Sequence, residues 1–537
     1  MKKTILMIYP KIPVTFWSND YALKFTDKKS GMPPLGLLTV AAMIPDNYEL
    51  KVVDVNTTEL NIKELEEADL VFISAMIIQI DSFEEVVKLC NQLNKLVVAG
   101  GAYPMGCYED IKGVDCFVLN EAEITLPLFF RDYENGNLKK IYMSDEKADI
   151  TKTPPPRWDL IDINLYASMA LQYSRGCPFN CEFCDIIEMY GRRVRTKTPG
   201  QFLGELNGLY ETGFKGPLFI VDDNFVGNMK KTKAVLEAIV QWQIEHDYPF
   251  HLYTEATIDL AQRDDILNLL VQAGFIHLFI GIESPDVNTL KKAQKTQNIR
   301  ADMLESVKKI QRRGINVMAG FILGFDTDPE DIFDMQIDFI QKAAIPVAMV
   351  GLLGALPNTQ LYRRLEKENR LIRDTIVTGN NVDPTLNFIP IMPKEKLLEG
   401  FKRVVTEIYK PENYFQRCTD LIRRMPDKHK IKMHRNKSNR SAFFMSLWKQ
   451  STSGYGRHYL CFLYKTLCHN WRIFPLAVLL AIQGHHYITI AKEIFKGDYL
   501  KDKKQRTIGK TRKITTDDPL RATRKRDPLC GCPAAER

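Results

Sequence analysis

Three cysteines lie close together in the stretch YSRGCPFNCEFCD, residues 173–185. Cys177, Cys181 and Cys184 follow the spacing CxxxCxxC, and the glycine and proline around the first of them exclude a regular helix or a central strand. The segment is therefore expected to be a loop, and a loop can turn three thiolates towards one point. Thiolates are soft ligands, so the pattern indicates an iron–sulfur cluster or zinc.

Three cysteines are one ligand too few for either centre. A structural zinc site takes four ligands, usually in two pairs, and a 4Fe–4S cluster also needs four. No histidine lies between Cys184 and His246. Three cysteines would therefore leave one iron of a cluster open to a ligand from outside the protein. The alternative is a chance group of buried or zinc-binding cysteines.

The cysteine spacing, with Phe183 before the last cysteine, resembles the signature of the radical S-adenosylmethionine (SAM) enzymes. The resemblance implies that the cysteines hold a 4Fe–4S cluster whose open iron chelates the amino and carboxylate groups of SAM. Later stretches resemble the same family in order: VDDNF at 221–225, GIESP at 281–285, GFILGFD at 320–326 and GALPN at 354–358. The residues that the resemblance assigns to SAM are Phe183, Asp222, Asp223, Asn224, Glu283, Ser284, Gly320 and Gly324.

Strand and helix patterns alternate from residue 169 to residue 385, the expected core. Strands are predicted near 168–173, 217–221, 251–255, 277–281, 316–323 and 348–353, and helices near 199–212, 230–244, 258–273, 299–313, 328–342 and 360–367. Six such units, beginning with the cysteine loop, resemble the partial (β/α)6 barrel of radical SAM enzymes. Barrel chemistry lies at the carboxyl ends of strands, where the stretches above fall.

The first segment, residues 1–145, also alternates strands and helices. Strands are predicted at 4–9, 50–55, 70–74, 95–99 and 116–119, and helices at 35–43, 62–67 and 82–93. This order predicts an α/β fold with a doubly wound, Rossmann-like parallel sheet, whose ligand would lie at the carboxyl ends of the strands. The GxGxxG fingerprint is absent after the first strand, where an aromatic pair, Phe16 and Trp17, stands instead, so a phosphate cradle is not expected.

This segment resembles the cobalamin-binding domain that precedes many radical SAM cores. The positions that the resemblance assigns to cobalamin are Ser74, Gln79, Gly100, Gly101, Asn120 and Glu121. Asn120 replaces the first glycine of a GEAE-like turn and still tolerates a positive φ. The first histidine of the chain is His246, so no histidine of this segment would ligate cobalt. The alternative is a Rossmann-like domain without a ligand.

Two segments flank the core. Residues 146–168 form a linker with a stiff proline-rich stretch, and residues 386–500 are expected to be a mostly helical extension, with a helix at 395–409 and two helices between 457 and 495 broken at Pro475. The extension resembles that of the radical SAM subgroup that includes the hopanoid C-2 methylases. It is either a cap on the open barrel edge or an interfacial lid that admits a lipid. Residues 501–537 form a basic tail that is expected to be disordered, in which Cys530 and Cys532 have no role.

The composition is that of a globular protein, and its 537 residues suggest about three domains. The hydrophobic fraction is 45%, and the eleven cysteines do not form a disulfide framework, which indicates a reducing, cytoplasmic compartment. The longest apolar run, 473–482, is shorter than the roughly 18 residues that span a bilayer, so no transmembrane helix is expected. Basic blocks at 423–440 and 501–526 contribute to the net charge of +7 and favour solvated surface or anionic lipid over nucleic acid.

The resemblances together imply an enzyme that uses a 4Fe–4S cluster, SAM and cobalamin. The resemblance implies cleavage of SAM to a 5′-deoxyadenosyl radical and methylation of an unactivated carbon, with a hopanoid or other isoprenoid lipid as the best-guess substrate. Two alternatives are a ring closure or rearrangement without methyl transfer, and a non-enzymatic metal-binding regulator. The expected partners are a small-molecule or lipid substrate and an electron donor such as flavodoxin or ferredoxin, without nucleic acid. The expected location is the cytoplasm, with peripheral contact to the inner face of the membrane.

Overall fold

The computed structural model describes residues 2–372, 375, 377–380, 383–426 and 437–494 of the chain. Contacts between residues divide the chain after Lys492, so both six-stranded sheets belong to the first unit, Met1–Lys492. The predicted basic tail, with Cys530 and Cys532, lies outside the described residues. The boundaries predicted at residues 145, 168 and 385 fall inside the first unit and stay predictions.

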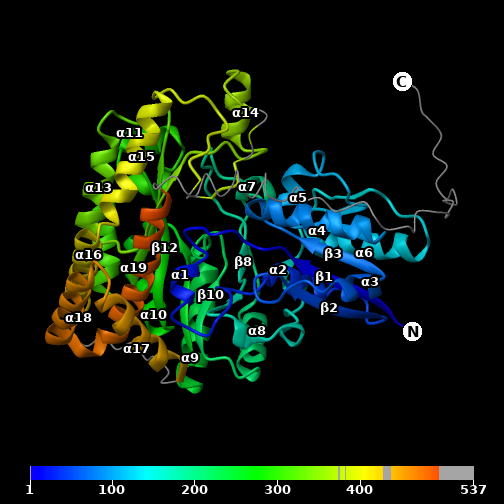
Figure 1. Cartoon of the computed structure of the whole chain (residues 1–537), viewed down its shortest axis with the longest axis horizontal. Helices are drawn as coiled ribbons and strands as arrows, with labels where there is room; N and C mark the ends of the chain where they lie inside the picture. Colours follow the sequence, from blue (N-terminus) through cyan, green and yellow to red (C-terminus); the bar gives the residue numbers. More distant parts are fainter. Residues whose placement is uncertain (1, 373–374, 376, 381–382, 427–436, 495–537) are drawn as a thin grey trace, which may run out of the picture. The chain divides into compact units, whose positions relative to one another are not determined.

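The N-terminal sheet has six parallel strands (Figure 1). They are β1 (Lys3–Tyr9), β2 (Tyr48–Asp54), β3 (Leu70–Ser74), β4 (Leu96–Gly100), β5 (Cys116–Val118) and β6 (Ile141–Tyr142), in the order β2-β1-β3-β4-β5-β6. The chain passes from β1 to β2 on one side and then to β3 on the other, which places a topological switch point between β1 and β3. The predicted doubly wound sheet is confirmed. Strand β6 was not predicted, because two residues carry no recognisable apolar pattern.

Helices cover both faces of this sheet. They are α2 (Leu35–Ala41), α3 (Ile62–Glu67), α4 (Ile80–Gln92), α5 (Ala102–Cys107) and α6 (Ala122–Glu134), with a 3-10 turn η1 (Ile77–Gln79) before α4. The short helix α1 (Asp20–Leu23) precedes them and packs, through Ala22, against the C-terminal helices instead. Leu65 and Phe83, from α3 and α4, are buried on one face. Leu37 and Phe129, from α2 and α6, are buried on the other. Both faces are therefore apolar, as in sheets of alternating strands and helices.

The second sheet also consists of six parallel strands. They are β7 (Met169–Leu171), β10 (Gly216–Ile220), β11 (Phe250–Ala256), β12 (Phe275–Glu283), β13 (Asn316–Leu323) and β14 (Ala348–Leu352), in the order β14-β13-β12-β11-β10-β7. Within the described residues β7 pairs only with β10 and β14 only with β13, so the barrel is open, as predicted. A short antiparallel pair, β8 (Ser174–Arg175) and β9 (Arg195–Thr196), flanks the cysteine loop.

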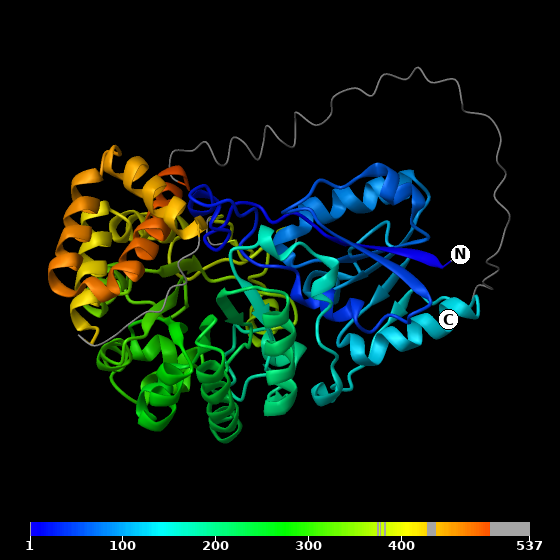
Figure 2. The ribbon, with the colours of Figure 1, turned by 90° about the horizontal axis from the view of Figure 1, so that it is seen from below.

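Helices follow the barrel strands, and Figure 2 shows several of them, in green, on the outer side of the sheet. They are α7 (Ile186–Met189), α8 (Pro199–Glu211), α9 (Met229–Glu245), α10 (Asp264–Gln272), α11 (Val287–Lys292), α12 (Met303–Arg312), α13 (Ile332–Ala343) and α14 (Gln360–Lys367). The 3-10 turns are η2 (Ile150–Lys152), η3 (Trp158–Leu160), η4 (Ile163–Leu165), η5 (Ile258–Gln262) and η6 (Thr296–Ile299). The helix predicted at 299–313 begins later because Asp302 caps it, accepting a hydrogen bond from the Glu305 N–H.

The C-terminal extension is helical, as predicted. Its helices are α15 (Lys394–Ile408), α16 (Pro411–Arg424), α17 (Lys437–Ser451), α18 (Gly456–Asn470) and α19 (Phe474–Ile494). The break predicted at Pro475 lies slightly earlier, at the turn η7 (Trp471–Ile473). Pro475 is the second residue of α19, where its missing N–H costs no helical hydrogen bond. Helix α16 was not predicted. Its Arg417 is buried and donates a hydrogen bond to the Ile345 carbonyl at 2.9 Å.

One helical segment, Gly456–Glu493, is long and apolar enough to cross a membrane by length and composition alone. This is weak evidence, because the core helices of globular proteins pass the same test and 56% of the most apolar part is buried. Leu476, Leu480 and Tyr487 of α19 are buried in the protein. The prediction that the chain has no transmembrane helix stays a prediction.

Candidate active site

The cysteine loop begins shortly after β7. Asp222, which follows β10, holds the chain ahead of the loop, because its carboxylate accepts hydrogen bonds from the Tyr173 N–H at 2.7 Å and the Ser174 hydroxyl at 2.6 Å. Gly176 has a φ of 90°, and a Cβ there would lie 2.8 Å from the Gly191 carbonyl oxygen. Only glycine therefore fits just before the first cysteine.

Side-chain amides approach two of the three loop sulfurs. Asn224 Nδ2 lies 3.8 Å from Cys177 Sγ, and Gln297 Nε2 lies 3.7 Å from Cys181 Sγ. Burial raises the pKa of the Cys177 thiol, so its thiolate needs a nearby positive charge or metal. In the part of the chain that the structure describes, no three Cys, His, Asp or Glu side chains surround a single metal-ion position. The donor set itself favours the cluster, because three thiolates do not complete a structural zinc site, whereas a 4Fe–4S cluster with three cysteine ligands leaves one iron open to a ligand from outside the protein.

Carboxylates lie at the carboxyl ends of the next two strands, β10 and β11. Burial, together with repulsion from Asp222, raises the pKa of Asp223 to about 7, and burial, together with repulsion from Asp223, raises that of Glu255 to about 8. Asp223 Oδ2 is buried and has no hydrogen-bond partner among the described residues. A buried carboxylate oxygen without a partner fits an N–H donor or a cationic group, and SAM carries an amino group and a sulfonium.

Glu283 ends β12 in a left-handed backbone conformation, with a φ of 61°. Its carboxylate accepts a hydrogen bond from Lys295 Nζ at 2.7 Å, and the same ammonium lies 5.9 Å from the centroid of the Phe183 ring. Burial lowers the pKa of Lys295, but the Glu283 carboxylate and the Cys181 thiol outweigh this effect and hold it above its usual range. A positive charge therefore lies beside the cysteine loop.

The remaining residues predicted to bind SAM have packing roles in the structure. The buried Ser284 hydroxyl accepts a hydrogen bond from the Asp286 N–H at 3.2 Å. A Cβ on Gly320 would lie 3.0 Å from the Phe279 ring, and a Cβ on Gly324, whose φ is 104°, would lie 3.1 Å from Leu397. Their contacts to the ribose and adenine of SAM stay predictions.

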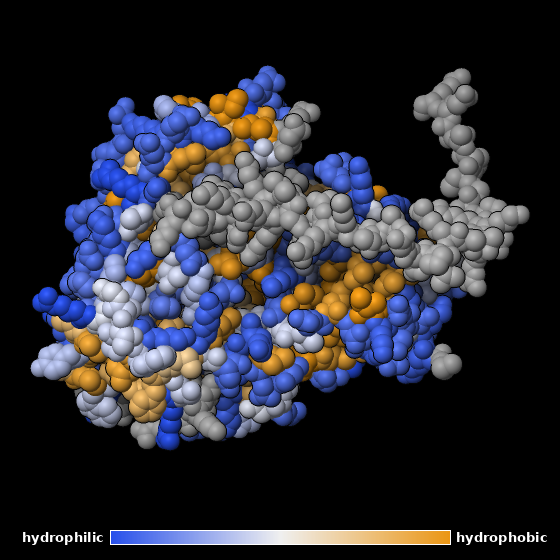
Figure 3. Space-filling view, in the orientation of Figure 1, coloured by the Kyte–Doolittle hydropathy of each residue, from blue (hydrophilic) through white to orange (hydrophobic). Residues whose placement is uncertain are grey.

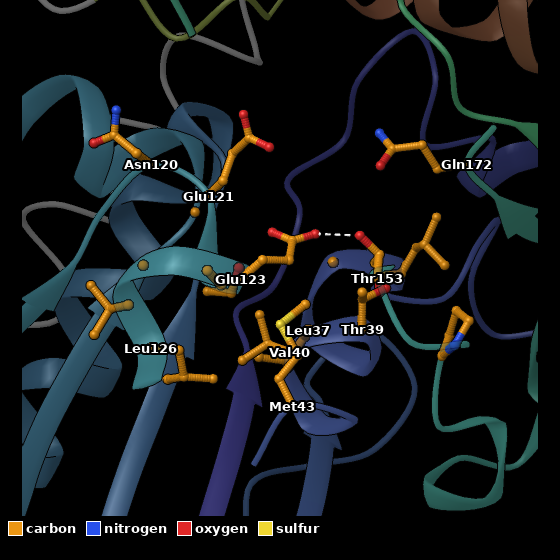
Figure 4. A pocket seen from close by; sticks show the side chains of 18 of the residues that line it. Leu37, Thr39, Val40, Met43, Asn120, Glu121, Glu123, Leu126, Thr153 and Gln172 are labelled. Atoms are coloured by element: carbon orange, nitrogen blue, oxygen red, sulfur yellow. Dashed lines mark hydrogen bonds between the residues drawn. The ribbon is translucent and has the colours of Figure 1, made fainter. Parts of the chain in front are cut away.

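A cavity of about 270 Å³ lies over the carboxyl ends of β3, β4 and β5 (Figure 4). The residues predicted for cobalamin that line it are Ser74, Gly100, Gly101, Asn120 and Glu121. Its apolar wall comes from α2, the turn after it and α6, and includes Leu37, Val40, Met43 and Leu126. A Cβ on Gly36 of α2 would meet no atom within 4 Å, so this glycine leaves the cavity open.

The cavity also contains a polar atom without a partner. Asn120 has a φ of 62°, as its position in the turn requires, and its Oδ1 is buried without a hydrogen-bond partner among the described residues. Gly101, with a φ of 92°, packs so closely that a Cβ would lie 2.8 Å from Ser74 Oγ. An apolar wall with one unpaired acceptor fits part of a large organic cofactor, because pockets that hold drug-sized ligands measure ~300–1,000 Å³.

The Glu121 carboxylate forms ion pairs with two arginines, one on each side of the cysteine loop. Arg175 Nη1 lies 2.9 Å from its carboxylate, and Arg195 Nη1 lies 2.7 Å from it. Arg175 also pairs with Glu123, which accepts a hydrogen bond from the Thr153 hydroxyl at 2.7 Å (Figure 4). The turn after β5 is thereby tied to the hairpin of β8 and β9 by buried ion pairs. The carboxylate of Glu121 is engaged in this network, and its contact with cobalamin stays a prediction.

Gln79 does not line the cavity. Its buried side chain accepts a hydrogen bond from the Met76 N–H at 2.8 Å and donates one to the Pro10 carbonyl. Gln79 therefore connects the loops after β1 and β3, on either side of the switch point. Its role in binding cobalamin stays a prediction.

The loop after β1 carries Trp17 to the barrel strands. Trp17 Nε1 donates to the Met349 sulfur at 2.9 Å, and its ring meets Phe279 edge-on at 5.4 Å between centroids. Phe219 and Tyr253 stack at 4.8 Å on the neighbouring strands β10 and β11. Phe279 on β12 lies in register with Glu255 at the end of β11, which places part of this aromatic group next to a carboxylate.

The same loop is fixed by the last helix. The Phe16 ring stacks on Tyr487 at 4.4 Å, and the Phe16 carbonyl accepts a hydrogen bond from His486 Nε2 at 3.1 Å. His486 is buried, and burial lowers its pKa to about 4, so the ring is neutral near pH 7. The aromatic pair found where a dinucleotide fingerprint would place glycines therefore joins β1, the barrel and α19.

Several residues of the site were missed by reasoning from the sequence. They are Lys295, Gln297, Arg175, Arg195 and the pair of Phe16 and Trp17 as a contact to the barrel. Lys295 and Gln297 follow a short helix and belong to no motif that was recognised. The arginines flank the cysteine loop, and no local pattern pointed to their partners, Glu121 just before α6 and Glu123 within it.

Models of three known families match the chain. The B12 binding domain matches residues 27–130, and the radical SAM superfamily matches residues 171–340. A domain of unknown function, DUF4070, matches residues 359–498, which include α15 to α19.

Curated relatives and solved structures are similar over most of the chain. An uncharacterized methyltransferase of Synechocystis sp. is 39% identical over 93% of this chain and 94% of its own. The hopanoid C-2 methylase of Rhodopseudomonas palustris is 32% identical over 77% of this chain and 78% of its own. The structure of OxsB, with aqua-cobalamin and SAM bound, is 14% identical and has a TM-score of 0.59 over 96% of this chain and 82% of that one. TsrM from Kitasatospora setae, with cobalamin and a 4Fe–4S cluster, is 17% identical, with a TM-score of 0.53 over 68% of this chain and 78% of that one.

Proposed function

Since the chain belongs to the cobalamin-binding radical SAM methyltransferases, we propose that it methylates an unactivated carbon of a polycyclic or isoprenoid lipid. Its cofactors are a 4Fe–4S cluster, SAM and cobalamin. The two relatives described above are a methyltransferase and a methylase by name, which favours methyl transfer over ring closure and makes the non-enzymatic alternative wrong.

Cys177, Cys181 and Cys184 would hold the cluster, and the carboxylates at the ends of β10 and β11 would hold SAM. The amide N–H groups of Asn224 and Gln297 direct positive dipoles at two of the sulfurs. Together the cofactors supply a carbon-centred radical and a methyl group. The residues of this chain orient the reacting groups and exclude water from them.

The cavity over β3, β4 and β5 is the proposed site for the nucleotide tail of cobalamin. Its support is the unpaired Asn120 Oδ1, the space left by Gly36 and the apolar wall. Because the residues of the N-terminal sheet include no histidine, the proposal involves no histidine ligand from this sheet.

A lipid substrate is supported by one observation above others. Trp17 contacts both Phe279 and Met349, and Phe279 lies in register with Glu255 on the neighbouring strand, so a substrate near this acid would meet apolar surface. Apolar ligands are bound mainly by such side chains. The hopanoid C-2 methylase among the relatives acts on a lipid of this class by name. A reduced flavodoxin or ferredoxin is the proposed electron donor, and the proposed location is the cytoplasm with peripheral contact to the membrane.

The test uses the full chain, purified without oxygen and reconstituted with iron, sulfide and cobalamin. SAM, a reductant and a detergent-solubilised hopanoid are added, and 5′-deoxyadenosine, S-adenosylhomocysteine and the mass of the lipid are measured. We expect both nucleoside products and a lipid heavier by one methylene unit. 5′-Deoxyadenosine with a lipid of unchanged mass would contradict methyl transfer.

Matched cysteine variants test the cluster ligands. Cys181→Ser should lose most of the bound iron and both nucleoside products. Cys461→Ser changes an exposed cysteine of α18 and should retain both. Equal iron content in the two variants would contradict the proposed role of the loop.

A further inference from the structure

Helix α18 has apolar side chains on two faces. Tyr459, Phe462 and Leu463 are buried against the protein. A second row, Leu460, Tyr464, Leu467 and Trp471, recurs at helical spacing on the exposed side, and Tyr464 and Trp471 are 69% and 68% exposed. A helix on the surface of a globular protein needs only one apolar face, so the second face lacks a partner within the described residues.

The neighbouring helix α17 extends this surface. Its Phe444 is 65% exposed and its Trp448 is 69% exposed. Both line a shallow surface depression together with Lys24, Ser441, Met445 and Lys449. Figure 3 shows apolar and weakly polar residues, orange and white, lying together over α17 and α18 at the lower left. The two helices contact each other, and the Phe443 ring meets Phe474 at 5.8 Å.

The charge around this surface has one sign. The sequence contains no Asp or Glu between Asp427 and Glu493. Arg457, Lys465 and Arg472 are exposed on or next to α18, and no acid among the described residues pairs with them. Exposed tryptophan and tyrosine beside unpaired cations are the side chains that favour the headgroup region of a membrane.

We propose that α17 and α18 dock the enzyme on the surface of a bilayer that contains anionic lipids. Trp448 and Trp471 would enter the boundary between headgroups and acyl chains, and Arg457, Lys465 and Arg472 would contact the headgroups. Docking on a membrane is useful to the enzyme if its substrate is a lipid, so this proposal rests on the proposed function. It adds the surface through which the enzyme would reach that lipid.

The position of this surface suits the supply of a lipid to the barrel. Ala22 and Phe25, in and just after α1, pack against Ala442 of α17 and Ile482 of α19. The segment that contains α1 also contains Trp17, which contacts Met349 and Phe279 in the barrel. The proposed docking surface and the aromatic side chains of the barrel are thus joined by one short segment.

Two other occupants fit less well. A second copy of the chain in a two-fold dimer would bring the same cations face to face, which is unfavourable. A membrane-spanning arrangement would need the apolar side chains of α19, but Leu476, Leu480 and Ile488 of that helix are buried in the protein. Docking on a bilayer surface neither brings these cations face to face nor exposes the buried side chains of α19.

The test measures flotation of the full chain with phosphatidylcholine vesicles, with and without phosphatidylglycerol, at low and high salt. We expect binding that requires phosphatidylglycerol and decreases with salt. Tryptophan fluorescence should be quenched by brominated acyl chains. Absence of binding to anionic vesicles at low salt would overturn the proposal. Dissociation of an oligomer into monomers when the two tryptophans are replaced would also overturn it, because it would show that a second copy of the chain covers this surface.

Matched variants locate the docking surface. Trp448→Ser with Trp471→Ser, and separately Lys465→Glu with Arg472→Glu, should each weaken vesicle binding about tenfold or more. Ile62→Ser with Ile244→Ser removes exposed apolar side chains elsewhere and should bind as the unchanged chain does. Activity on detergent-solubilised lipid should be equal in all of them, so failure of docking is distinguishable from failure of methylation. Equal vesicle binding by all variants would overturn the proposal.

Discussion

The side-chain amides of Asn224 and Gln297 lie near sulfurs of the cysteine loop at 3.8 and 3.7 Å. Hydrogen bonds to the sulfurs of an iron–sulfur cluster stabilise its reduced, more negative form and so raise its reduction potential. Gln297 is buried and follows Lys295 by two residues, so the chain places a dipole and a charge beside the same group.

Replacing Gln297 by leucine should make the potential of the reconstituted cluster more negative. The change removes the N–H donor to Cys181 and keeps a side chain of similar size. A redox titration followed by electron paramagnetic resonance measures the midpoint. Gln272→Leu, on α10, serves as the control and should leave it unchanged. An unshifted midpoint in Gln297→Leu would show that the amide does not act on the cluster.

The affinity for SAM should rise with pH between about 6 and 8. Asp223 and Glu255 have pKa values of about 7 and about 8, raised mainly by burial, so both are largely protonated at pH 6. The cationic groups of SAM favour the ionised carboxylates, so binding releases protons, and affinity falls about tenfold per pH unit for each group below its pKa. Calorimetry in buffers with different ionisation enthalpies measures this release. Asp223→Asn should bind SAM with a weaker pH dependence, and an unaltered dependence would contradict the assignment.

At the residue scale, functional residues that lie in motifs could be predicted from the sequence. The side chains that pair with them in the fold could not. The cysteines and the acids after β10 follow a recognisable spacing. Lys295 pairs with Glu283 across the short helix α11, and no local pattern encodes that pairing. Glu121 was predicted as a ligand contact, yet its carboxylate pairs with Arg175 and Arg195, which lie far from it in the sequence.

At the scale of elements, the space between α2 and the N-terminal sheet depends on one small residue. Gly36 faces the cavity over β3, β4 and β5, and a larger side chain there would meet no protein atom within 4 Å of its Cβ. The helix would tolerate the change, because leucine forms helices better than glycine.

Gly36→Leu should therefore reduce the cobalamin bound per chain without unfolding the protein. The added side chain fills the space proposed for the nucleotide tail, while the cysteine loop is unaltered. Cobalamin is measured by its absorbance after gel filtration, and iron content and thermal unfolding are measured in parallel. Gly204→Leu, on α8, makes the same change at an exposed position and should bind cobalamin normally. Full cobalamin content in Gly36→Leu would contradict the position of the site.

Apart from the two-residue β6, the strands of both sheets could be predicted, because buried parallel strands read as short apolar runs. Helix α16 could not, since its sequence is rich in charge. Its Arg417 is buried only because the Ile345 carbonyl and Gln341 lie opposite it, and neither is near in the sequence. The sequence pattern predicts a break at Pro475, whereas α19 begins one residue earlier, at Phe474. The proline does not break the helix, because proline is tolerated inside the first turn.

At the scale of the whole molecule, the loop after β1 joins the N-terminal sheet, the barrel and α19. Replacing His486 by phenylalanine should loosen this loop. The Phe16 carbonyl would lose its hydrogen bond, worth about 1 kcal/mol, which corresponds to roughly fivefold more of the open loop. Cleavage by chymotrypsin near Phe16 and Trp17 measures the opening. His458→Phe, at an exposed position of α18, is the control, and equal cleavage rates in the two variants would contradict the role of His486.

The contact between Phe16 and His486 also sets an order of events during synthesis. The two residues are 470 positions apart, and ribosomes add about 5–20 residues per second, so His486 emerges roughly 25–95 s after Phe16. The N-terminal sheet needs no strand from beyond residue 142 and can form early in this interval. The segment that carries Phe16 and Trp17 acquires its final anchor only when the last helix is made. A nascent chain therefore has a period in which its first sheet is complete while that segment is still open to large molecules.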